Sequence, residues 1–387
     1  MDYDLTVIGA GITGAGVAQA GAAAGYKVLL LEAGEVGHAT SSKSSKLIHG
    51  GLRYLESAQL SLVRESLHER ELLLKLAPGL VKLAPLHIPV YESSSRSRAT
   101  IFAGLSLYRL LSGWDPSTRF TQLKPSQWEA LDGINTQGLR GVFRYYEAQT
   151  DDRQLTRAVV ASACSLGAEL QTGARLTSAA RHAFGCDLEY VKSSQHHHLR
   201  TRVLINCAGP WAAQVNGLID PAPELPGIDL VQGSHLLLPP LLQHHYYLES
   251  PTDGRAVFAL PWRGQLLVGT TETPHTGAPE AAECHPQEMH YLINVLKHYF
   301  PQLHILPSSA ETFAGLRVLP HSNAAAFGRS REVMMIADNQ TTPRVLTVMG
   351  GKLTTYRATA RQVIERVYPS LPAARGIADT AQLPLSP

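Results

Sequence analysis

The sequence predicts a mixed fold: an α/β domain with a parallel, Rossmann-like sheet, interrupted by an inserted α+β domain with an antiparallel sheet. Three observations predict it. The chain begins with an apolar run, a glycine-rich turn and a small-residue helix pattern. Its middle alternates turns with short apolar segments, at residues 230–231, 235–238, 256–260 and 266–268. The 387 residues leave room for two or three domains.

The N-terminal unit starts with a buried-strand pattern at residues 4–8. Residues 9–14, Gly-Ala-Gly-Ile-Thr-Gly, match G-x-G-x-x-G and lead into a helix whose free N–H groups suit a pyrophosphate. A second strand, residues 26–31, ends at Glu32, which lies 21 residues after Gly11. This spacing is typical of an acid that binds a ribose hydroxyl. The unit indicates a dinucleotide and leaves FAD and NAD open.

Composition excludes several classes of function. Lys plus Arg number 34 and Asp plus Glu 32, a balance without the charge excess of a nucleic-acid-binding chain. The four cysteines show no Cys-x-x-Cys spacing, so no metal site is expected and a reducing cytoplasm is the default location. The run 196–198, three histidines in a polar stretch, is expected to be a solvated loop. Residues 5–26 are uncharged, but their six glycines favour strand–turn–helix over a membrane span.

The segment 40–56, TSSKSSKLIHGGLRYLE, follows this unit. Its hydroxyl side chains can donate to phosphate oxygens, and Gly50-Gly51 permits close approach to a flat ring. A flexible Ser-rich loop would explain the first half, but the second half is mostly apolar and is expected to be buried.

The segment resembles the signature of FAD-dependent glycerol-3-phosphate dehydrogenases and oxidases, within the D-amino-acid-oxidase-like superfamily. Other segments resemble motifs of that family in the same order, namely 143–156, 205–212, 232–239, 258–273, 315–319 and 348–357. The resemblance implies non-covalent FAD and a role in glycerol metabolism. The reaction implied is oxidation of sn-glycerol 3-phosphate to dihydroxyacetone phosphate by hydride transfer from C2 to flavin N5. Electrons would pass to quinone or another acceptor.

The glycine motif and the resemblance together imply a set of FAD-binding residues. They are Gly9, Gly11, Ile12, Thr13, Gly14, Glu32, Thr40, Ser41, Ser42, Lys46, Leu47, Ile48, His49, Arg175, Leu176, Ala208, Gly209, Trp211, Gly315, Arg317, Gly350, Gly351, Lys352, Leu353 and Thr354.

The resemblance also implies the residues that handle the substrate. The substrate-binding set is Arg53, Tyr54, Thr271, Arg317, Lys352 and Thr355. Arginine suits a phosphate because it binds bidentately. The catalytic set is His49, His235, Arg317 and Lys352. Either histidine could accept the proton of the alcohol, and Arg317 could instead steady the developing alkoxide.

The sequence departs from the family pattern at Gln232, Glu272 and Val318, where Lys, Asp and Pro are expected. These departures keep open an FAD-dependent oxidase or dehydrogenase of another hydroxy acid or amino acid. A further alternative is a flavin-binding protein that lost turnover with the family's C-terminal domain.

The domains are expected to be discontinuous. The FAD-binding domain comprises residues 1–79, 151–214 and 331–370, the substrate domain 80–150 and 215–330, and a Pro-rich tail 371–387. Family members continue into a C-terminal helical domain, which this chain is expected to lack. Residues 96–112 could form a basic amphipathic helix on a membrane or a core-facing helix with exposed arginines. The expected location is cytoplasmic, with peripheral contact to the inner membrane as an option.

Overall fold

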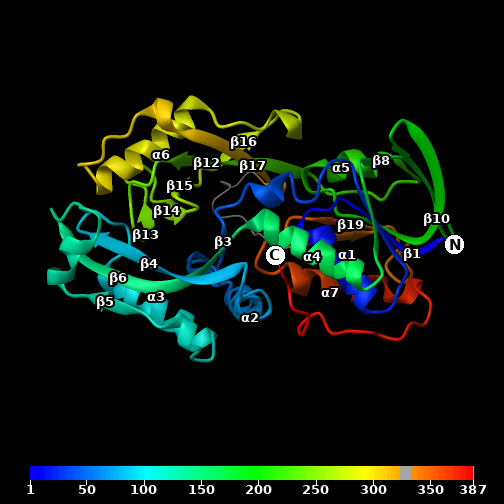
Figure 1. Ribbon diagram of the computed structural model, residues 1–387, viewed down its shortest axis with the longest axis horizontal. Coiled ribbons are helices and arrows are strands. Elements are labelled where there is room, and N and C mark those ends of the chain that lie inside the picture. Colours follow the sequence, from blue (N-terminus) through cyan, green and yellow to red (C-terminus); the bar gives the residue numbers. More distant parts are fainter. Residues whose placement is uncertain (323–332, 387) are drawn as a thin grey trace.

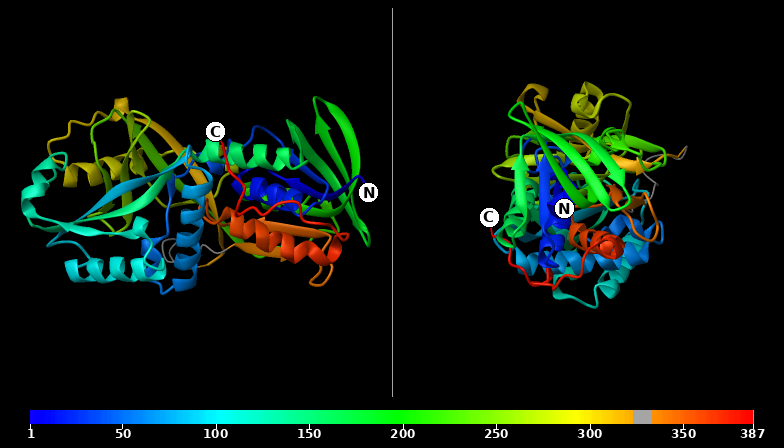
Figure 2. Two further views of the ribbon diagram at one scale, coloured as in Figure 1. Left: turned by 60° about the horizontal axis from the view of Figure 1, so that its bottom comes forward. Right: turned by 90° about the vertical axis from the view of Figure 1, so that its right-hand side faces the viewer.

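A computed structural model describes residues 1–322 and 333–386. The molecule is elongated, and two sheets occupy its two halves (Figures 1 and 2). The N-terminus lies at the far end of the half that holds the first sheet. This arrangement agrees with the predicted fold class, an α/β unit combined with a second, mainly antiparallel sheet.

The first sheet has the order β11-β8-β9-β10-β1-β2-β7, with β19 on β10 and β18 on β19. Its parallel centre is β19, β10, β1, β2 and β7. Residues of β2 are buried on both faces, as the apolar run 28–32 requires. The strands are β1 (Tyr3–Ile8), β2 (Val28–Glu32), β7 (Glu169–Thr172), β8 (Ala174–His182), β9 (Gly185–Lys192), β10 (Gln195–Asn206), β11 (Ile219–Asp220), β18 (Met334–Ala337) and β19 (Val345–Met349).

Three helices accompany this sheet, and α1 packs between the other two (Figure 1). They are α1 (Ile12–Ala23), α4 (Asp152–Ser165) and α7 (Tyr356–Val367), with a short α5 (Ala212–Asn216) after β10. The Ala- and Gly-rich sequence of α1 explains its central place, because small side chains let its backbone approach both neighbours. Asp151 caps α4 by accepting the Gln154 N–H.

The second sheet has the order β16-β12-β15-β14-β13-β4-β6-β3, with β17 on β12 and β5 on β6. All pairs are antiparallel except β13 with β4. The strands are β3 (Leu47–Ile48), β4 (Val81–Tyr91), β5 (Thr121–Leu123), β6 (Leu139–Thr150), β12 (Ile228–Leu238), β13 (His245–Glu249), β14 (Ala256–Trp262), β15 (Gln265–Gly269), β16 (Thr273–His275) and β17 (Glu311–Pro320). The accompanying helices are α2 (Leu60–Leu76), α3 (Arg98–Leu111) and α6 (Pro286–Tyr299).

The histidine run is not the solvated loop that the polar composition suggested. Residues 196–198 pair antiparallel with β9 as the first part of β10. Ser193 and Ser194 form the two-residue turn between the strands, and both have positive φ, 50° and 63°. This geometry is that of a type I′ hairpin turn, which usually carries Asn or Gly. The absence of those residues concealed the hairpin.

Two strands pair in a different sheet from the one that the expected domain boundaries suggest. β3 pairs in the second sheet, although its residues fall within the range 1–79, and β11 pairs in the first sheet beyond residue 214. The boundary at 330/331 and the final residue 387 lie outside the described residues. From 371 to 386 the tail has no helix or strand, and the Leu385 N–H donates to the Leu76 carbonyl at the end of α2.

Across the part of the chain that the structure describes, no helix is long and apolar enough to cross a membrane. Nor does any group of three or more His, Cys, Asp and Glu side chains among residues 1–322 and 333–386 have the arrangement of a metal site.

Candidate active site

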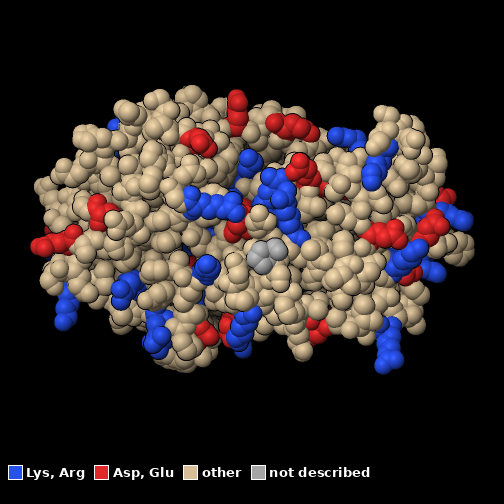
Figure 3. All heavy atoms as spheres, viewed as in Figure 1, with Lys and Arg blue, Asp and Glu red and all other residues tan. Residues whose placement is uncertain are grey.

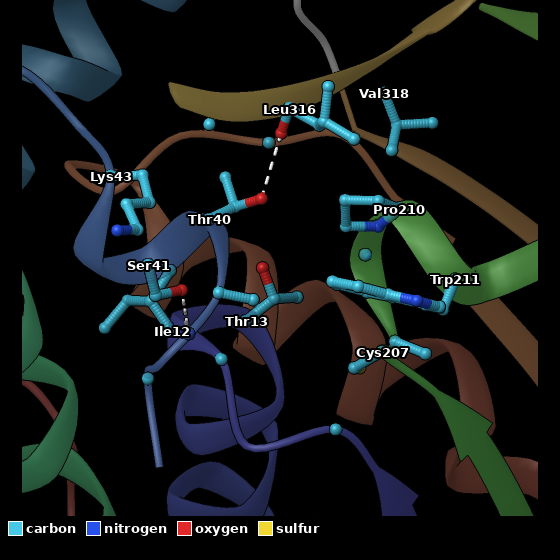
Figure 4. Close-up of a pocket in the computed structure, with 18 of the residues that line it drawn as sticks. Ile12, Thr13, Thr40, Ser41, Lys43, Cys207, Pro210, Trp211, Leu316 and Val318 are labelled. Atoms are coloured by element: carbon cyan, nitrogen blue, oxygen red, sulfur yellow. Dashed lines mark hydrogen bonds between the residues drawn. The ribbon is translucent and has the colours of Figure 1, made fainter. Parts of the chain in front are cut away.

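One large cavity, of about 880 Å³, is lined by the motifs that lie far apart in the sequence. Figure 4 shows Thr40, Ser41 and Lys43 on one side and Pro210 and Trp211 on the other. Most of the predicted site residues line it: Gly9, Gly11, Ile12, Thr13, Glu32, Thr40, Ser41, Leu47, His49, Tyr54, Arg175, Leu176, Ala208, Gly209, Trp211, Gly315, Arg317, Gly350, Gly351, Lys352, Leu353 and Thr354.

The turn after β1 forms the floor of one end of the cavity. Gly9 has φ +97°, and a Cβ there would lie 2.7 Å from the Cys207 carbonyl oxygen. A Cβ on Gly14 would lie 1.9 Å from the Gly9 carbonyl oxygen. Only glycine therefore fits at either position, and the backbone at the start of α1 stays open to a phosphate. Cys207 is a packed residue, and burial raises the pKa of its thiol to about 12.

Glu32 ends β2 at the cavity wall. Its two carboxylate oxygens each accept a backbone N–H, from Ala10 at 2.7 Å and from Gly34 at 2.7 Å. These two bonds orient the carboxylate, and each oxygen keeps a further lone pair. This geometry fits an acceptor for ribose hydroxyls.

The Ser-rich segment crosses the cavity as an ordered element. Ser41 Oγ accepts the Ile12 N–H at 2.9 Å, and Thr40 Oγ1 donates to the Leu316 carbonyl at 3.0 Å (Figure 4). Lys46 is buried, has φ 58° and forms an ion pair with Asp152 at 2.8 Å. Lys46 therefore anchors the segment from behind, and Asp152, at the start of α4, is a supporting residue that the sequence interpretation did not single out.

His49, Tyr54, Arg317 and Lys352 also line the cavity. The Lys352 Nζ lies 3.7 Å from the centre of the Tyr54 ring, a cation–π contact. Arg317 on β17 pairs with Glu272 at 3.2 Å and contacts the Thr270 hydroxyl at 3.4 Å. Two cations and a histidine therefore border one space, which suits an anionic substrate with an alcohol to deprotonate.

His235 and Thr271 take different places. His235 is 1% exposed, stacks on Phe313 with ring centres 4.8 Å apart, and bonds through Nε2 to Ser45 Oγ at 2.9 Å. Burial, with Arg317 and Lys46 nearby, holds its pKa well below the usual range. Thr271 donates to Glu288 on α6 and accepts the Ser234 N–H at 2.9 Å. Both side chains are buried in the half of the molecule that holds the second sheet.

Eight predicted residues are not part of the cavity lining that residues 1–322 and 333–386 form. They are Gly14, Ser42, Lys46, Ile48, Arg53, His235, Thr271 and Thr355. Arg53 lies beside the lining, with its guanidinium carbon 5.2 Å from the Tyr54 ring centre. Thr355 is buried where α7 begins, and its carbonyl accepts the Thr359 N–H.

Several cavity residues were not predicted. Lys43, Phe258 and Pro210 all line the cavity. Burial lowers the pKa of Lys43, and Lys46 nearby lowers it further. Each residue lies within a segment that resembles a family motif, but its residue type gave no reason to assign it to the site.

The departures from the family pattern each have a structural partner. Gln232 donates to the Glu288 carboxylate at 2.7 Å and to the Glu283 carbonyl at 2.7 Å. Glu272 pairs with Arg317, and Val318 is buried in the cavity wall.

Known proteins resemble this chain over nearly its whole length. A family model described as FAD dependent oxidoreductase (DAO) matches residues 4–357. A glycerol-3-phosphate dehydrogenase of Pseudomonas aeruginosa is 36% identical over 396 residues, which cover 99% of this chain and 75% of the relative. A D-erythritol 1-phosphate dehydrogenase of Brucella abortus is 34% identical over 375 residues, covering 94% and 73%. The solved glycerol-3-phosphate dehydrogenase of Bacillus halodurans, complexed with FAD, shares the fold with a TM-score of 0.78 at 24% identity, covering 100% and 68%.

The chain belongs to the DAO family of FAD-dependent oxidoreductases. Within that family it groups with the glycerol-3-phosphate dehydrogenases, and FAD is its cofactor. The glycine turn and the hydroxyl-rich segment fit the pyrophosphate of FAD, and the oriented Glu32 carboxylate fits a ribose of the cofactor.

Proposed function

We propose that the protein oxidises sn-glycerol 3-phosphate to dihydroxyacetone phosphate. The observation that carries the proposal is the meeting of His49, Arg317 and Lys352 in the cavity that the cofactor motifs also line. FAD, when bound, supplies the flavin N5 that accepts hydride from C2 of the substrate.

The phosphate of the substrate needs cationic partners, and Lys352 and Arg317 are the cavity's candidates. The Tyr54 ring holds the Lys352 ammonium, while Arg53 adds a second positive charge beside that ring. Glu272 pairs with the Arg317 guanidinium, a planar group whose geometry suits bidentate binding of a phosphate. Arg317 would also stabilise negative charge on the C2 oxygen as the proton leaves.

His49 is our candidate for the base. It lines the cavity beside Tyr54 and Lys352, whereas His235 is enclosed by Phe313 and Ser45. A neutral imidazole at His49 would take the hydroxyl proton while a hydride leaves C2, so that the alcohol loses one proton to His49 and one hydride, which carries both electrons, to the flavin. His235 would support the segment around Ser45.

Electrons must then leave the protein, and we propose quinone at a membrane surface as the acceptor. Helix α3 buries Ile101, Leu105 and Tyr108 but leaves Phe102 and Leu110 each 55% exposed. Arg109 lies over the Trp114 ring, which is 60% exposed. An apolar face bordered by arginines suits peripheral contact with anionic lipid. Figure 3 shows Lys and Arg side chains near the middle of one face, with Asp and Glu side chains among them.

The test is anaerobic addition of glycerol 3-phosphate to the purified holoprotein. We expect the absorbance of oxidised flavin to bleach, with formation of dihydroxyacetone phosphate. An unchanged flavin spectrum at saturating substrate would overturn the proposal.

A longer polyol phosphate is the second candidate, because one relative is a D-erythritol 1-phosphate dehydrogenase and Glu272 adds a carboxylate beside Arg317. D-erythritol 1-phosphate, a 2-hydroxy acid and an amino acid belong in the same bleaching panel. Bleaching by one of these alone would reassign the substrate. Retention of FAD without bleaching by any of them would indicate a flavin-binding protein without turnover.

A further inference from the structure

The peptide unit that carries His49 is held by buried side chains from both halves of the molecule. The His49 N–H donates to Thr354 Oγ1 at 3.1 Å, and the same hydroxyl donates to the His49 carbonyl at 3.3 Å. The next N–H, of Gly50, donates to Glu147 Oε2 at 3.2 Å. Thr354 precedes α7 beside the first sheet, and Glu147 lies on β6 of the second. The backbone that carries His49, the candidate base, is therefore held by hydrogen bonds at two successive N–H groups, those of His49 and Gly50.

Glu147 is itself fixed by two further buried groups. Arg70 of α2 donates to the same oxygen, Oε2, at 2.7 Å, and the Tyr108 hydroxyl of α3 donates to Oε1. Arg70, Tyr108 and Glu147 are each 1% exposed. Burial raises the pKa of Glu147, and Arg70 opposes that shift. Each carboxylate oxygen has a donor, so the Gly50 N–H meets an acceptor that cannot rotate away.

Tyr108 also fills the space beneath Gly50. A Cβ on Gly50 would lie 2.2 Å from the Tyr108 hydroxyl oxygen and 2.6 Å from a Leu67 methyl carbon. The Tyr108 ring and the Glu147 carboxylate therefore fix the position of the His49–Gly50 turn. A displacement of this turn would move His49 relative to Lys352 and Tyr54.

We propose that Glu147, held by Arg70 and Tyr108, is a positioning residue that acts with Thr354 to place the His49 side chain for proton transfer. The inference rests on the proposed function only in naming His49 as the base. It assigns a role to three buried residues that are not part of the cavity lining.

Tyr108→Phe is the sharpest variant, because it removes one donor and leaves the Arg70–Glu147 ion pair intact. Tyr91→Phe is a matched control: the Tyr91 hydroxyl is also buried and donates to the Asn135 carbonyl at 2.5 Å, outside this cluster. We expect kcat of Tyr108→Phe to fall about 10- to 100-fold with KM and FAD content nearly unchanged, since small misplacement of a reacting group costs that much. The control should keep kcat, and the pH profile of kcat should shift only in Tyr108→Phe.

Two variants of Thr354 test the positioning role independently of Tyr108. Thr354→Val should lower kcat, and Thr354→Ser, which keeps the hydroxyl, should restore it. Equal kcat and pH profiles in Tyr108→Phe and Tyr91→Phe would overturn the inference, as would full kcat in Thr354→Val.

The two proposals can fail separately. Wild-type protein that glycerol 3-phosphate does not bleach would refute the proposed function. The midpoint of the His49 imidazole titration, followed by NMR with His49→Gln for assignment, does not depend on turnover. A different midpoint in Tyr108→Phe and an unchanged one in Tyr91→Phe would support the positioning role. The same midpoint in both variants would refute it.

Discussion

The ammonium of Lys352 lies over the ring of Tyr54, 3.7 Å from its centre. Lys352 comes from the loop between β19 and α7, and Tyr54 follows β3. The contact therefore joins a late motif to an early one in the cavity lining.

Removing the ring should weaken substrate binding. A cation–π contact is worth about 0.5–2 kcal/mol, so Tyr54→Leu should raise KM for glycerol 3-phosphate by about 2- to 30-fold through a less ordered Lys352. Tyr54→Phe keeps the ring and is the matched control in steady-state assays. Equal KM values in the two variants would transfer the role from the ring to the hydroxyl.

Arg317→Gln tests the cation on β17. The variant loses a charge-assisted partner of the substrate and leaves Glu272 beside the cavity, so kcat/KM should fall about 100-fold or more while FAD content stays unchanged. Arg361→Gln, on an α7 side chain that is 61% exposed, should be silent in both measurements. Retained kcat/KM in Arg317→Gln would exclude Arg317 from the substrate site.

Gly14→Ala tests the pyrophosphate cradle. Its Cβ would collide with the Gly9 carbonyl, so the turn must open and FAD should be lost. The ratio of flavin absorbance to protein absorbance measures this. Gly104→Ala in α3, where a Cβ would meet no atom within 4 Å, should keep full FAD and gain up to about 1 kcal/mol of stability. A Gly14→Ala protein that retains its full FAD content would refute the role of this turn in binding the pyrophosphate.

Stability should fall in acid because of buried histidines. Burial lowers the pKa of His87 and of His245 to about 4 each. Between about pH 6.5 and pH 4 the unfolded chain binds protons that the folded chain does not, so the stabilisation is complete above pH 6.5 and is lost as the pH falls. One such group contributes about 1–2 kcal/mol between pH 7 and pH 5.

Urea unfolding at pH 7 and pH 5 measures this loss. His87→Gln keeps a donor for the His245 carbonyl and should flatten the pH dependence, whereas His290→Gln, at an exposed position, should leave it unchanged. An identical loss in wild type and His87→Gln would refute the assignment to His87.

Membrane contact should depend on the exposed face of α3. The double variant Phe102→Ser, Leu110→Ser removes two exposed apolar side chains and should lose most binding to anionic vesicles in a sedimentation assay at low salt. Phe184→Ser removes a residue that is 74% exposed on the β8–β9 hairpin and should bind as wild type does. Wild-type protein that stays wholly in the supernatant would refute the contact.

The cofactor half of the site was predictable because its chemistry is local in sequence. The glycine turn, the strand before it and Glu32 are fixed by contacts within one βαβ unit, such as the bond from Ala10 to Glu32. Helix α7 and the strand before it also lie where the glycine-rich motif indicated.

The substrate half was less predictable, since it depends on which partner each strand meets. Thr271 lies in a matching motif, yet α6 packs against that face of the sheet and directs the hydroxyl to Glu288. His235 likewise meets Phe313 because β12 pairs with β17 in that register. The support of the His49–Gly50 turn joins residues from α2, α3 and β6, and no spacing along the chain reveals such a cluster.

Helix α3 has two faces with different connections. Tyr108 on its inner face bonds to Glu147, while Phe102 and Leu110 on its outer face meet solvent. A surface that binds α3 preferentially in one position would move Tyr108 and, through Glu147, the turn that carries His49. Contact with that surface and substrate oxidation would then be coupled through a single helix.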